Sequence, residues 1–495
     1  MSAEIPKPVD IETEFLVIGS GPAGQKAAIQ AAKTGVKVAL IERERSVGGA
    51  CVHTGTIPSK SLREQALRRR AAVHASRSPA CGINLAPPEP LESMSQSLGD
   101  LLAGVGDTVA AHDHYMEAQL HRNGVQLLRG QAQFLDASRV SVRQIDGSKI
   151  FVTAPRIVIA TGSRPRAPAS INVDHEHVLD SDSILSLAYL PRSLLVLGGG
   201  VIASEYAAMF AALGCQVVQA DRGERPLAFV DAEMSAFYLE ELRSNGGEFT
   251  GRRQIAGCEW DGVSQVHSLF EDGQVIVTDK VLVALGRVAN VDGLGLENIG
   301  VALTKSGHVS VDACLQTSVT GIYAAGDVIG PPALASAAME QGRRAACSAL
   351  GLMAPIEFAA RIPSGIYTIP EISMVGMDEA AARTQFGGAL VGRARFDEIA
   401  RGQINGSPRG LLKLIADGAG RRVVGVQIAG DHATELVHVG QLGLAAELDV
   451  DAYVDNVFNF PTMAEAYRVA ALDIVKQRRI ATGNEFVAHA AAEIL

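Results

Sequence analysis

A strand, a glycine turn and a helix follow one another at two distant places in this sequence. In the first copy, the apolar run at residues 15–18 precedes Gly-Ser-Gly-Pro-Ala-Gly at residues 19–24. In the second copy, the apolar run at residues 194–197 precedes Gly-Gly-Gly-Val-Ile-Ala at residues 198–203. Small residues at this spacing permit a tight turn, close approach of a pyrophosphate, and close packing of helix on strand. The repeat therefore predicts an α/β chain with two parallel-sheet βαβ domains.

An acidic residue follows each copy at the same distance. Glu42 lies 18 residues beyond Gly24, and Asp221 lies 18 residues beyond Ala203. In Rossmann-like domains, a carboxylate at about this place accepts hydrogen bonds from ribose hydroxyls. We therefore expect two bound dinucleotides. The expected contacts are Gly19, Gly21, Gly24 and Glu42 in the first domain and Gly198, Gly200, Ala203 and Asp221 in the second.

Length, charge and composition argue against several other classes of protein. A chain of 495 residues suits about three domains. Its net charge of −10, without a clustered basic face, argues against nucleic acid as a partner. The polar N-terminus and the short apolar runs predict no secretory signal and no membrane span, so we expect a cytoplasmic protein. The six cysteines lack metal-site spacing, which predicts no metal centre.

The order of apolar runs predicts that the first domain is discontinuous. A strand that ends in Gly326-Asp327, followed by an alanine-rich helix, indicates a return of the chain to the first sheet. A pattern of alternating strands then predicts a third, mixed α and β domain. Between the two fingerprints, the prolines and serines of residues 76–97 predict a surface excursion. The predicted segments are 1–165, 166–289, 290–355 and 356–495.

A third motif lies at residues 48–60, Gly-Gly-Ala-Cys-Val-His-Thr-Gly-Thr-Ile-Pro-Ser-Lys. With the two fingerprints, it makes the chain resemble the two-dinucleotide-binding-domain flavoproteins, the superfamily of glutathione reductase and dihydrolipoamide dehydrogenase. Within that superfamily, residues 54–60, 180–184 and 460–468 are most similar to the motifs of the soluble (Si-specific) pyridine nucleotide transhydrogenases. The likeness extends over roughly residues 14–475.

This resemblance implies FAD in the first domain, and NAD(H) and NADP(H) as substrates in the second. Asp327 would hold the ribityl chain, and Lys60, paired with Glu205, would lie near flavin N5. The third domain would form a homodimer or a larger homo-oligomer. The implied catalytic residues are Lys60, Glu205, Thr56 and Cys51. The further implied cofactor contacts are Gly49, Cys51, Lys60, Thr161, Gly162, Arg222, Gly286, Gly326 and Ala335.

Two positions depart from the disulfide-reductase pattern. Thr56 stands where a reductase has its second cysteine, so Cys51 has no partner across that spacing. Phe460 stands where a reductase has a histidine, oriented by Glu465, that protonates a thiolate. Because the histidine acid is useful only when thiols react, the absence of the histidine is consistent with the absence of the second cysteine. The resemblance then implies hydride transfer from NADPH through FAD to NAD+.

Several alternatives remain at this stage. A flavin that cannot pass its electrons to a disulfide also suits an NAD(P)H:quinone reductase. A non-catalytic flavoprotein subunit is a further possibility. Arg222 and Arg225, next to Asp221, suit a pocket that accepts a 2′-phosphate as well as a free ribose; the alternative is plain NAD preference with the two arginines exposed to solvent. Cys51 is either a small packed residue or a thiol that reacts with an external partner.

Overall fold

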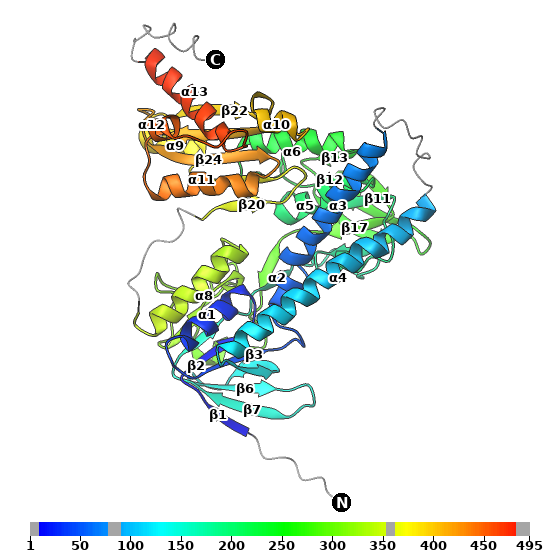
Figure 1. Cartoon of the computed structure of the whole chain (residues 1–495). Coiled ribbons are helices and arrows are strands. Elements are labelled where there is room, and N and C mark those ends of the chain that lie inside the picture. Colours follow the sequence, from blue (N-terminus) through cyan, green and yellow to red (C-terminus); the bar gives the residue numbers. More distant parts are fainter. Residues whose placement is uncertain (1–8, 78–90, 353–361, 482–495) are drawn as a thin grey trace, which may run out of the picture. The chain divides into compact units, whose positions relative to one another are not determined.

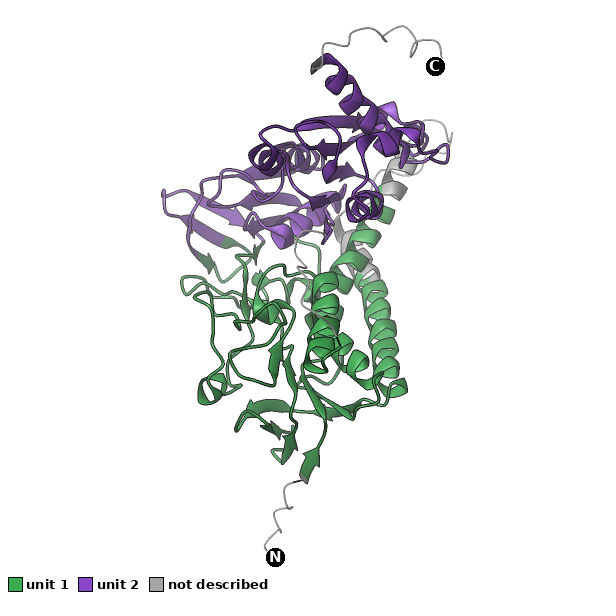
Figure 2. Cartoon of the chain, turned by 90° about the vertical axis from the view of Figure 1, so that its left-hand side faces the viewer, with its two compact units in different colours: residues 1–191, 258–266, 280–357 green, residues 192–257, 267–279, 358–495 purple. Residues whose placement is uncertain are grey.

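Two units, each with its own core, divide the chain (Figure 2). The computed structural model describes residues 9–77, 91–352 and 362–481. Among these residues, no helix is both long and apolar enough to cross a membrane. Unit 1 consists of residues 1–191, 258–266 and 280–357, and unit 2 of residues 192–257, 267–279 and 358–495.

A five-stranded parallel sheet forms the centre of unit 1 (Figure 1). Its strand order is β19-β8-β2-β3-β4, so the chain returns to the first sheet after residue 320. Every residue of β2 is buried, because α1 and α8 share a hydrophobic core with one face of the sheet and strands β5–β7 share another core with the opposite face. The elements of this sheet are β2 Phe15–Ile18, α1 Pro22–Ala32, β3 Val38–Glu42, β4 Gln126–Arg129, β8 Ile157–Ile159, β19 Ile322–Ala324 and α8 Ala335–Ala349.

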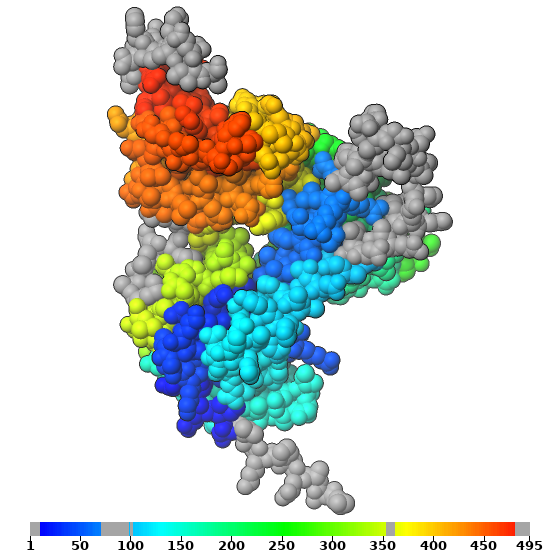
Figure 3. Space-filling view, viewed as in Figure 1, coloured from blue at the N-terminus to red at the C-terminus, as the bar shows by residue number. Residues whose placement is uncertain are grey.

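Two long helices add to unit 1 beside this sheet. Helices α3 and α4 pack along one another, and α4 forms the cyan ridge of the space-filling view (Figure 3). Here the prediction of a surface excursion over residues 76–97 is partly wrong, because α3 runs to Arg77 and α4 begins at Leu91; residues 78–90 lie outside the described residues. Proline and serine content did not reveal the helical period after residue 90. The helices are α2 Gly49–His53, α3 Thr56–Arg77 and α4 Leu91–Arg122.

Smaller strands complete unit 1. The second sheet has the order β1-β7-β6-β5, and β9 and β18 form an antiparallel pair. Strand β10 pairs in parallel with β17. The bounds are β1 Val9–Glu12, β5 Gln131–Phe134, β6 Arg139–Arg143, β7 Lys149–Thr153, β9 Ser163–Pro165, β10 Val178–Asp180, η2 Ile184–Ser186, β17 Lys280–Val283, β18 Arg287–Ala289, α7 Leu296–Ile299 and η3 Asp327–Ile329. Strand β14, Ile255–Trp260, has its first three residues in unit 2 and its last three in unit 1.

Unit 2 begins with the second strand, glycine turn and helix. Strands β11, β12 and β13 are parallel, and nine consecutive residues of α5 are buried. The bounds are β11 Ser193–Leu197, α5 Val201–Ala212, β12 Gln216–Ala220, α6 Ala232–Ser244, β13 Gly247–Thr250, β15 Val266–Phe270 and β16 Val275–Thr278.

The C-terminal part of unit 2 is an antiparallel sheet of order β20-β21-β24-β23-β22. Helices α11, α12 and α13 share one hydrophobic core with β22–β24, and a smaller core with Ala382 of α9 contains Val391, Ile415 and Val424. The bounds are β20 Ser364–Ile366, β21 Ile372–Gly376, α9 Glu379–Phe386, β22 Leu390–Arg395, η5 Phe396–Glu398, α10 Ala400–Ile404, β23 Gly410–Ala416, β24 Val423–Gly430, α11 Ala433–Ala445, α12 Val450–Asp455 and α13 Glu465–Ala481.

Candidate functional site

The first glycine turn joins β2 to α1 in unit 1. Gly19 has φ +101°, and a Cβ there would lie 2.4 Å from the Ala160 carbonyl oxygen. A Cβ on Gly24 would lie 1.8 Å from the Gly19 carbonyl oxygen. By contrast, a Cβ on Gly21 would lie more than 4 Å from the atoms of the described residues beyond its neighbours. Packing therefore demands glycine at 19 and 24, whereas Gly21 leaves open space at the N-terminus of α1, where backbone N–H groups suit an anion.

Glu42 ends β3 beside this turn, and its side chain is buried. Its Oε2 accepts hydrogen bonds from the backbone N–H of Ser20 at 2.9 Å and from Ser20 Oγ at 2.6 Å. Its Oε1 accepts one from the N–H of Glu44 at 2.9 Å. An ionised carboxylate has about four acceptor positions. The carboxylate is thus oriented by protein groups and keeps capacity for a further donor, such as a ribose hydroxyl.

The third motif forms the corner between α2 and α3. A Cβ on Gly49, which has φ +60°, would lie 3.1 Å from Gly21 Cα, so the start of α2 adjoins the first glycine turn. Burial raises the pKa of Cys51; a hydrogen bond with the Thr56 side chain and the Lys60 charge lower it by less, and the Asp327 charge raises it. The Thr56 side chain therefore contacts Cys51, and the charges of Lys60 and Asp327 act on the thiol. The raised pKa keeps Cys51 a neutral thiol at physiological pH.

The turn after β8 holds two of the predicted cofactor contacts. Thr161 Oγ1 donates to the Asn290 carbonyl oxygen at 2.7 Å, and Asn290 Nδ2 donates to the Thr161 carbonyl oxygen at 3.0 Å. Gly162 has φ +70° and Gly286 has φ +104°, conformations that favour glycine. Sequence reasoning missed Asn290, although it lies four residues after the predicted contact Gly286.

Asp327 opens the short helix η3 after β19. Gly326 has φ +82° and donates its N–H to Gln341 Oε1, a side chain of α8, at 2.9 Å. The Asp327 carboxylate accepts a hydrogen bond from Ser163 Oγ at 2.7 Å. Ala335 is the first residue of α8, whose first turn carries no acidic residue. Ser163 and Gln341 were missed in the sequence, although Ser163 adjoins the predicted contact Gly162.

The second glycine turn joins β11 to α5 in unit 2. Gly198 has φ +126°, and a Cβ on Gly199 would lie 3.0 Å from Asp221 Cγ. Gly200 caps α5, and the described residues leave the space around its Cβ position open. Ala203 is fully buried within α5. This turn repeats the features of the first one, with an open helix N-terminus beside a carboxylate.

The loop after β12 separates the two arginines that adjoin Asp221. Asp221 Oδ1 accepts a hydrogen bond from the Gly223 N–H at 2.7 Å. The Arg225 guanidinium donates to the backbone carbonyl oxygens of residues 227, 228 and 230, with the shortest distance 2.9 Å. Arg222 is exposed. Arg225 thus stabilises its own loop, and Arg222 is the better placed of the two to meet a solvent-borne phosphate.

Glu205 is buried in α5, and its Oε1 accepts a hydrogen bond from the Tyr367 N–H at 2.8 Å. Lys60 belongs to unit 1 and Glu205 to unit 2, so their pairing stays a prediction. Near the C-terminus, the Phe460 side chain is 70% exposed, and Glu465 Oε2 accepts a hydrogen bond from the Thr462 N–H at 3.2 Å. Glu465 therefore caps its own turn.

Comparison with known families now adds to this geometry. Residues 13–342 match the family described as pyridine nucleotide-disulphide oxidoreductase, and residues 362–471 match the dimerisation domain of that family. The chain belongs to the pyridine nucleotide-disulphide oxidoreductase family. This membership confirms the predicted fold class, with two dinucleotide-binding domains of Rossmann type and a C-terminal dimerisation domain.

Named members of the pyridine nucleotide-disulphide oxidoreductase family are similar over almost the whole chain. A soluble pyridine nucleotide transhydrogenase of Mycobacterium tuberculosis is 41% identical over 475 residues, which are 94% of this chain and 98% of its own length. One from Yersinia enterocolitica is 39% identical over 465 residues, 93% of this chain and 97% of its own length. The resemblance stated from the motifs is thereby confirmed.

Solved structures agree with this family fold. LpdA from Mycobacterium tuberculosis has a TM-score of 0.85 and 27% identity, covering 93% of this chain and 99% of its own. A Cu(II) complex of the HOCl-induced flavoprotein disulfide reductase RclA from Escherichia coli has a TM-score of 0.83 and 25% identity, with coverage of 93% and 99%.

Proposed function

We propose that this chain is an FAD-dependent NAD(P)+ transhydrogenase that moves hydride between NADPH and NAD+. The observation that carries the proposal is Thr56, which lies beside Cys51 in the corner between α2 and α3, where a disulfide reductase has its second cysteine. A hydroxyl cannot form a disulfide, so the two-electron path of a disulfide reductase ends at this corner. The names of the relatives at about 40% identity support the same activity.

The first glycine turn fits FAD. The open space at Gly21 and the N-terminus of α1 suit its pyrophosphate, and Glu42 has acceptor capacity for ribose hydroxyls. Asp327 would accept a hydrogen bond from the ribityl chain. FAD, when bound, supplies a group that takes up a hydride from one nicotinamide and gives it to another. The further cofactor contacts in this proposal are Gly19, Gly24, Gly49, Cys51, Lys60, Thr161, Gly162, Gly286, Gly326 and Ala335.

The second glycine turn would bind both nicotinamide nucleotides in turn. Gly198, Gly200 and Ala203 would surround the pyrophosphate, and Asp221 would accept hydrogen bonds from a free ribose. Arg222 would meet the 2′-phosphate of NADP(H) through charge-assisted hydrogen bonds. Use of one pocket by both nucleotides implies ping-pong kinetics, since the first product must leave before the second substrate enters.

Lys60 and Glu205 would act as a pair near the reacting ring, and Thr56 and Cys51 would line it. In this proposal, residues 1–165 and 290–355 form the FAD domain, 166–289 the NAD(P) domain and 356–495 the dimerisation domain. The latter would join two or more copies of the chain in the cytoplasm.

Anaerobic stopped-flow spectroscopy tests the proposal. The purified protein is first reduced with NADPH while flavin absorbance is recorded, and is then mixed with excess NAD+. We expect rapid bleaching followed by rapid recovery of the oxidised spectrum. Recovery with a quinone but not with NAD+ would indicate a quinone reductase instead, and absence of bleaching would indicate a non-catalytic flavoprotein.

A further inference from the structure

A chain of hydrogen bonds runs from Arg287 through Ser163 to Asp327 within unit 1. Arg287 Nε donates to Ser163 Oγ at 2.8 Å, and Ser163 Oγ donates to Asp327 Oδ2 at 2.7 Å. Arg287 Nη2 also donates to the Ser163 carbonyl oxygen at 2.8 Å. Arg287 therefore binds both the side chain and the backbone carbonyl group of Ser163, across the antiparallel pair of β9 and β18.

The chemistry of these groups sets the direction of the chain. A guanidinium can only donate, so the Ser163 oxygen must accept from Arg287. The single hydroxyl hydrogen of Ser163 is then left for Asp327, which, when ionised, can only accept. Both bonds involve an ionised group, which makes them stronger than bonds between neutral groups. Arg287 thus determines which way the Ser163 hydroxyl points, and that hydroxyl determines where Asp327 Oδ2 lies.

The other carboxylate oxygen of Asp327 remains available to a ligand. Within the described part of the chain, Asp327 Oδ1 accepts no hydrogen bond shown by the structure. Rotation of the carboxylate would break its bond with Ser163, so Oδ1 is held in one direction. A carboxylate held in this way binds a hydroxyl donor without first losing rotational freedom.

Arg287 also reaches the motif Asp180-Ser181-Asp182-Ser183, for which the sequence suggested no chemistry. Its Nη1 lies 3.4 Å from Ser181 Oγ and 4.0 Å from Asp182 Oδ1. Burial raises the pKa of Asp182, while the Arg287 charge and a hydrogen bond with Thr54, at the end of α2, lower it by less. The Arg287 side chain is only 22% exposed. The Arg287 guanidinium therefore connects Ser163, at the start of β9, with the turn after β10. Through Asp182 it also reaches the corner between α2 and α3.

We propose that Ser163 and Arg287 are positioning residues for FAD, which orient Asp327 so that it accepts a hydrogen bond from the flavin nucleotide. The proposal rests on the FAD site described under the proposed function. It adds two residues that affect FAD binding by orienting Asp327, and not by direct contact with the reacting ring. It also gives the Asp180–Ser183 motif a role, since this turn holds the far side of the Arg287 guanidinium.

A double-mutant cycle on FAD affinity tests this proposal. Ser163→Ala, Arg287→Met and the double variant are prepared as apoproteins and titrated with FAD, and bound flavin is measured by fluorescence. We expect Ser163→Ala to weaken FAD binding about tenfold, the loss typical of one charge-assisted hydrogen bond. Because Arg287 acts on Asp327 through the Ser163 hydroxyl, adding Arg287→Met to Ser163→Ala should weaken FAD binding no further, so the double variant should bind FAD as Ser163→Ala does. Losses that multiply in the double variant, or single variants that bind FAD like the wild type, would overturn the proposal.

Two controls separate positioning from folding. Arg139→Met removes an arginine of unit 1 that pairs with Asp10 at 3.0 Å, away from the nucleotide motifs, and should leave FAD affinity unchanged. The urea midpoint of each apoprotein should stay close to that of the wild type, because a merely structural role would lower the midpoint and the affinity together. If Arg287→Met does not fold, Arg287→Lys replaces it in the cycle. Lysine keeps the charge but cannot donate from two nitrogens to Ser163, so weakened binding is again expected and wild-type binding would overturn the proposal.

Failure of the proposed function gives a different result. Wild-type apoprotein that does not bind FAD, or holoprotein that NADPH does not bleach, would contradict the FAD-dependent transhydrogenase itself. Wild-type protein that binds FAD and is bleached, while the variants bind FAD equally well, would contradict only the roles of Ser163 and Arg287.

Discussion

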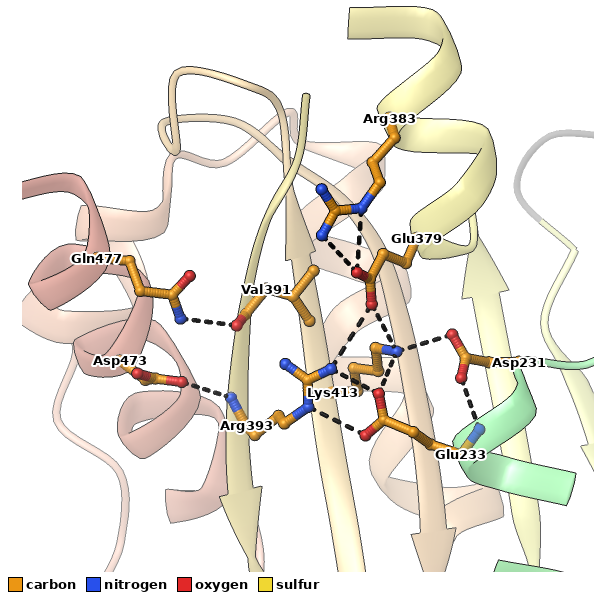
Figure 4. Close-up of polar contacts among 9 residues, drawn as sticks. All are labelled: Asp231, Glu233, Glu379, Arg383, Val391, Arg393, Lys413, Asp473 and Gln477. Atoms are coloured by element: carbon orange, nitrogen blue, oxygen red, sulfur yellow. Dashed lines mark hydrogen bonds and ion pairs between the residues drawn. The ribbon is translucent and has the colours of Figure 1, made fainter. Parts of the chain in front are cut away.

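Lys413 Nζ donates to the carboxylate of Glu379 at 2.8 Å, although Lys413 lies in β23 and Glu379 begins α9 (Figure 4). The same ammonium group donates at 2.8 Å to Asp231 and at 2.8 Å to Glu233, at the start of α6. Burial lowers the pKa of Lys413, but its hydrogen bonds with the three carboxylates together raise it above its usual value. Within unit 2, this cluster joins the second parallel-sheet domain to the C-terminal antiparallel sheet.

Replacement of Lys413 by methionine should destabilise unit 2. The side chain is 1% exposed, and its removal takes away the one cation that contacts all three carboxylates, although Arg393 still pairs with Glu233 and Glu379. Loss of one partner from a buried ion pair costs about 3 to 5 kcal/mol, so we expect about 2 to 4 kcal/mol at these partly exposed acids. Urea unfolding followed by circular dichroism measures the loss. Arg395→Met, which removes an exposed pair with Asp397, should leave the curve unchanged; an equal loss in both variants would contradict the prediction.

The same cluster should make unit 2 sensitive to acid. Hydrogen bonding with Arg393 is the largest cause that lowers the pKa of Glu233, to about 2, with Lys413 adding to it. A carboxyl whose pKa is depressed by folding stabilises the folded state above its unfolded pKa, near 4.5, and loses that contribution as pH falls toward about 2. Urea midpoints measured between about pH 5 and pH 2.5 should therefore fall with pH, and less steeply in Arg393→Met. Equal slopes in wild type and variant would contradict this assignment.

Two glycines of the first turn should respond differently to alanine. Gly24→Ala places a Cβ 1.8 Å from the Gly19 carbonyl oxygen, so the apoprotein should lose more than about 2 kcal/mol of unfolding free energy. Gly21→Ala meets open space in the protein and should keep the stability of the apoprotein within about 0.5 kcal/mol. It should nevertheless weaken FAD binding at least about tenfold, because the methyl group occupies the space proposed for the pyrophosphate. Normal FAD binding by Gly21→Ala would argue against that placement.

Restoring the second cysteine should restore an additional electron acceptor. Because Thr56 hydrogen-bonds with Cys51, Thr56→Cys should place two sulfur atoms close enough to form a disulfide. Anaerobic reductive titration should then consume about four electrons per FAD, against about two in the wild type, since a disulfide takes up two electrons. The double variant Cys51→Ser, Thr56→Cys is the control and should return to the wild-type value. A single variant that also consumes about two electrons would show that the two side chains do not meet.

The two arginines after Asp221 should have separate effects. Arg222→Ala should lower kcat/KM for NADPH about tenfold and change that for NADH less than about twofold, because only NADPH carries the 2′-phosphate. Arg225 donates to three backbone carbonyl oxygens of its own loop. Arg225→Ala should therefore lower stability and affect both nucleotides alike. A selective loss of NADPH in Arg225→Ala, with none in Arg222→Ala, would reverse these roles.

Local pattern predicted the elements that hold the candidate cofactor contacts. The apolar run at residues 15–18 became β2, the run at 194–197 lies within β11, and each is followed by a glycine turn and a helix. These features follow from neighbouring residues, since backbone sterics and hydrophobic period act over a few positions. Helix α4 was missed because the prolines and serines before it concealed its start.

Contacts between distant segments could not be predicted in the same way. Ser163 is separated by 164 residues from Asp327 and by 124 from Arg287, and no local pattern relates them. The roles that Arg225 plays toward its loop and Lys413 toward three acids were equally hidden. Each depends on which donors and acceptors the folded backbone brings within about 3 Å.

The sequence by itself determined the two strand, turn and helix units, their acidic partners, and the missing second cysteine, because each is a property of residues close together in the chain. Only the tertiary structure decided how the Asp327 carboxylate is oriented, which arginine near Asp221 is used by its own loop, and what surrounds Lys413. Those outcomes depend on directional hydrogen bonds between segments far apart in sequence, and such bonds exist only once the sheets have assembled.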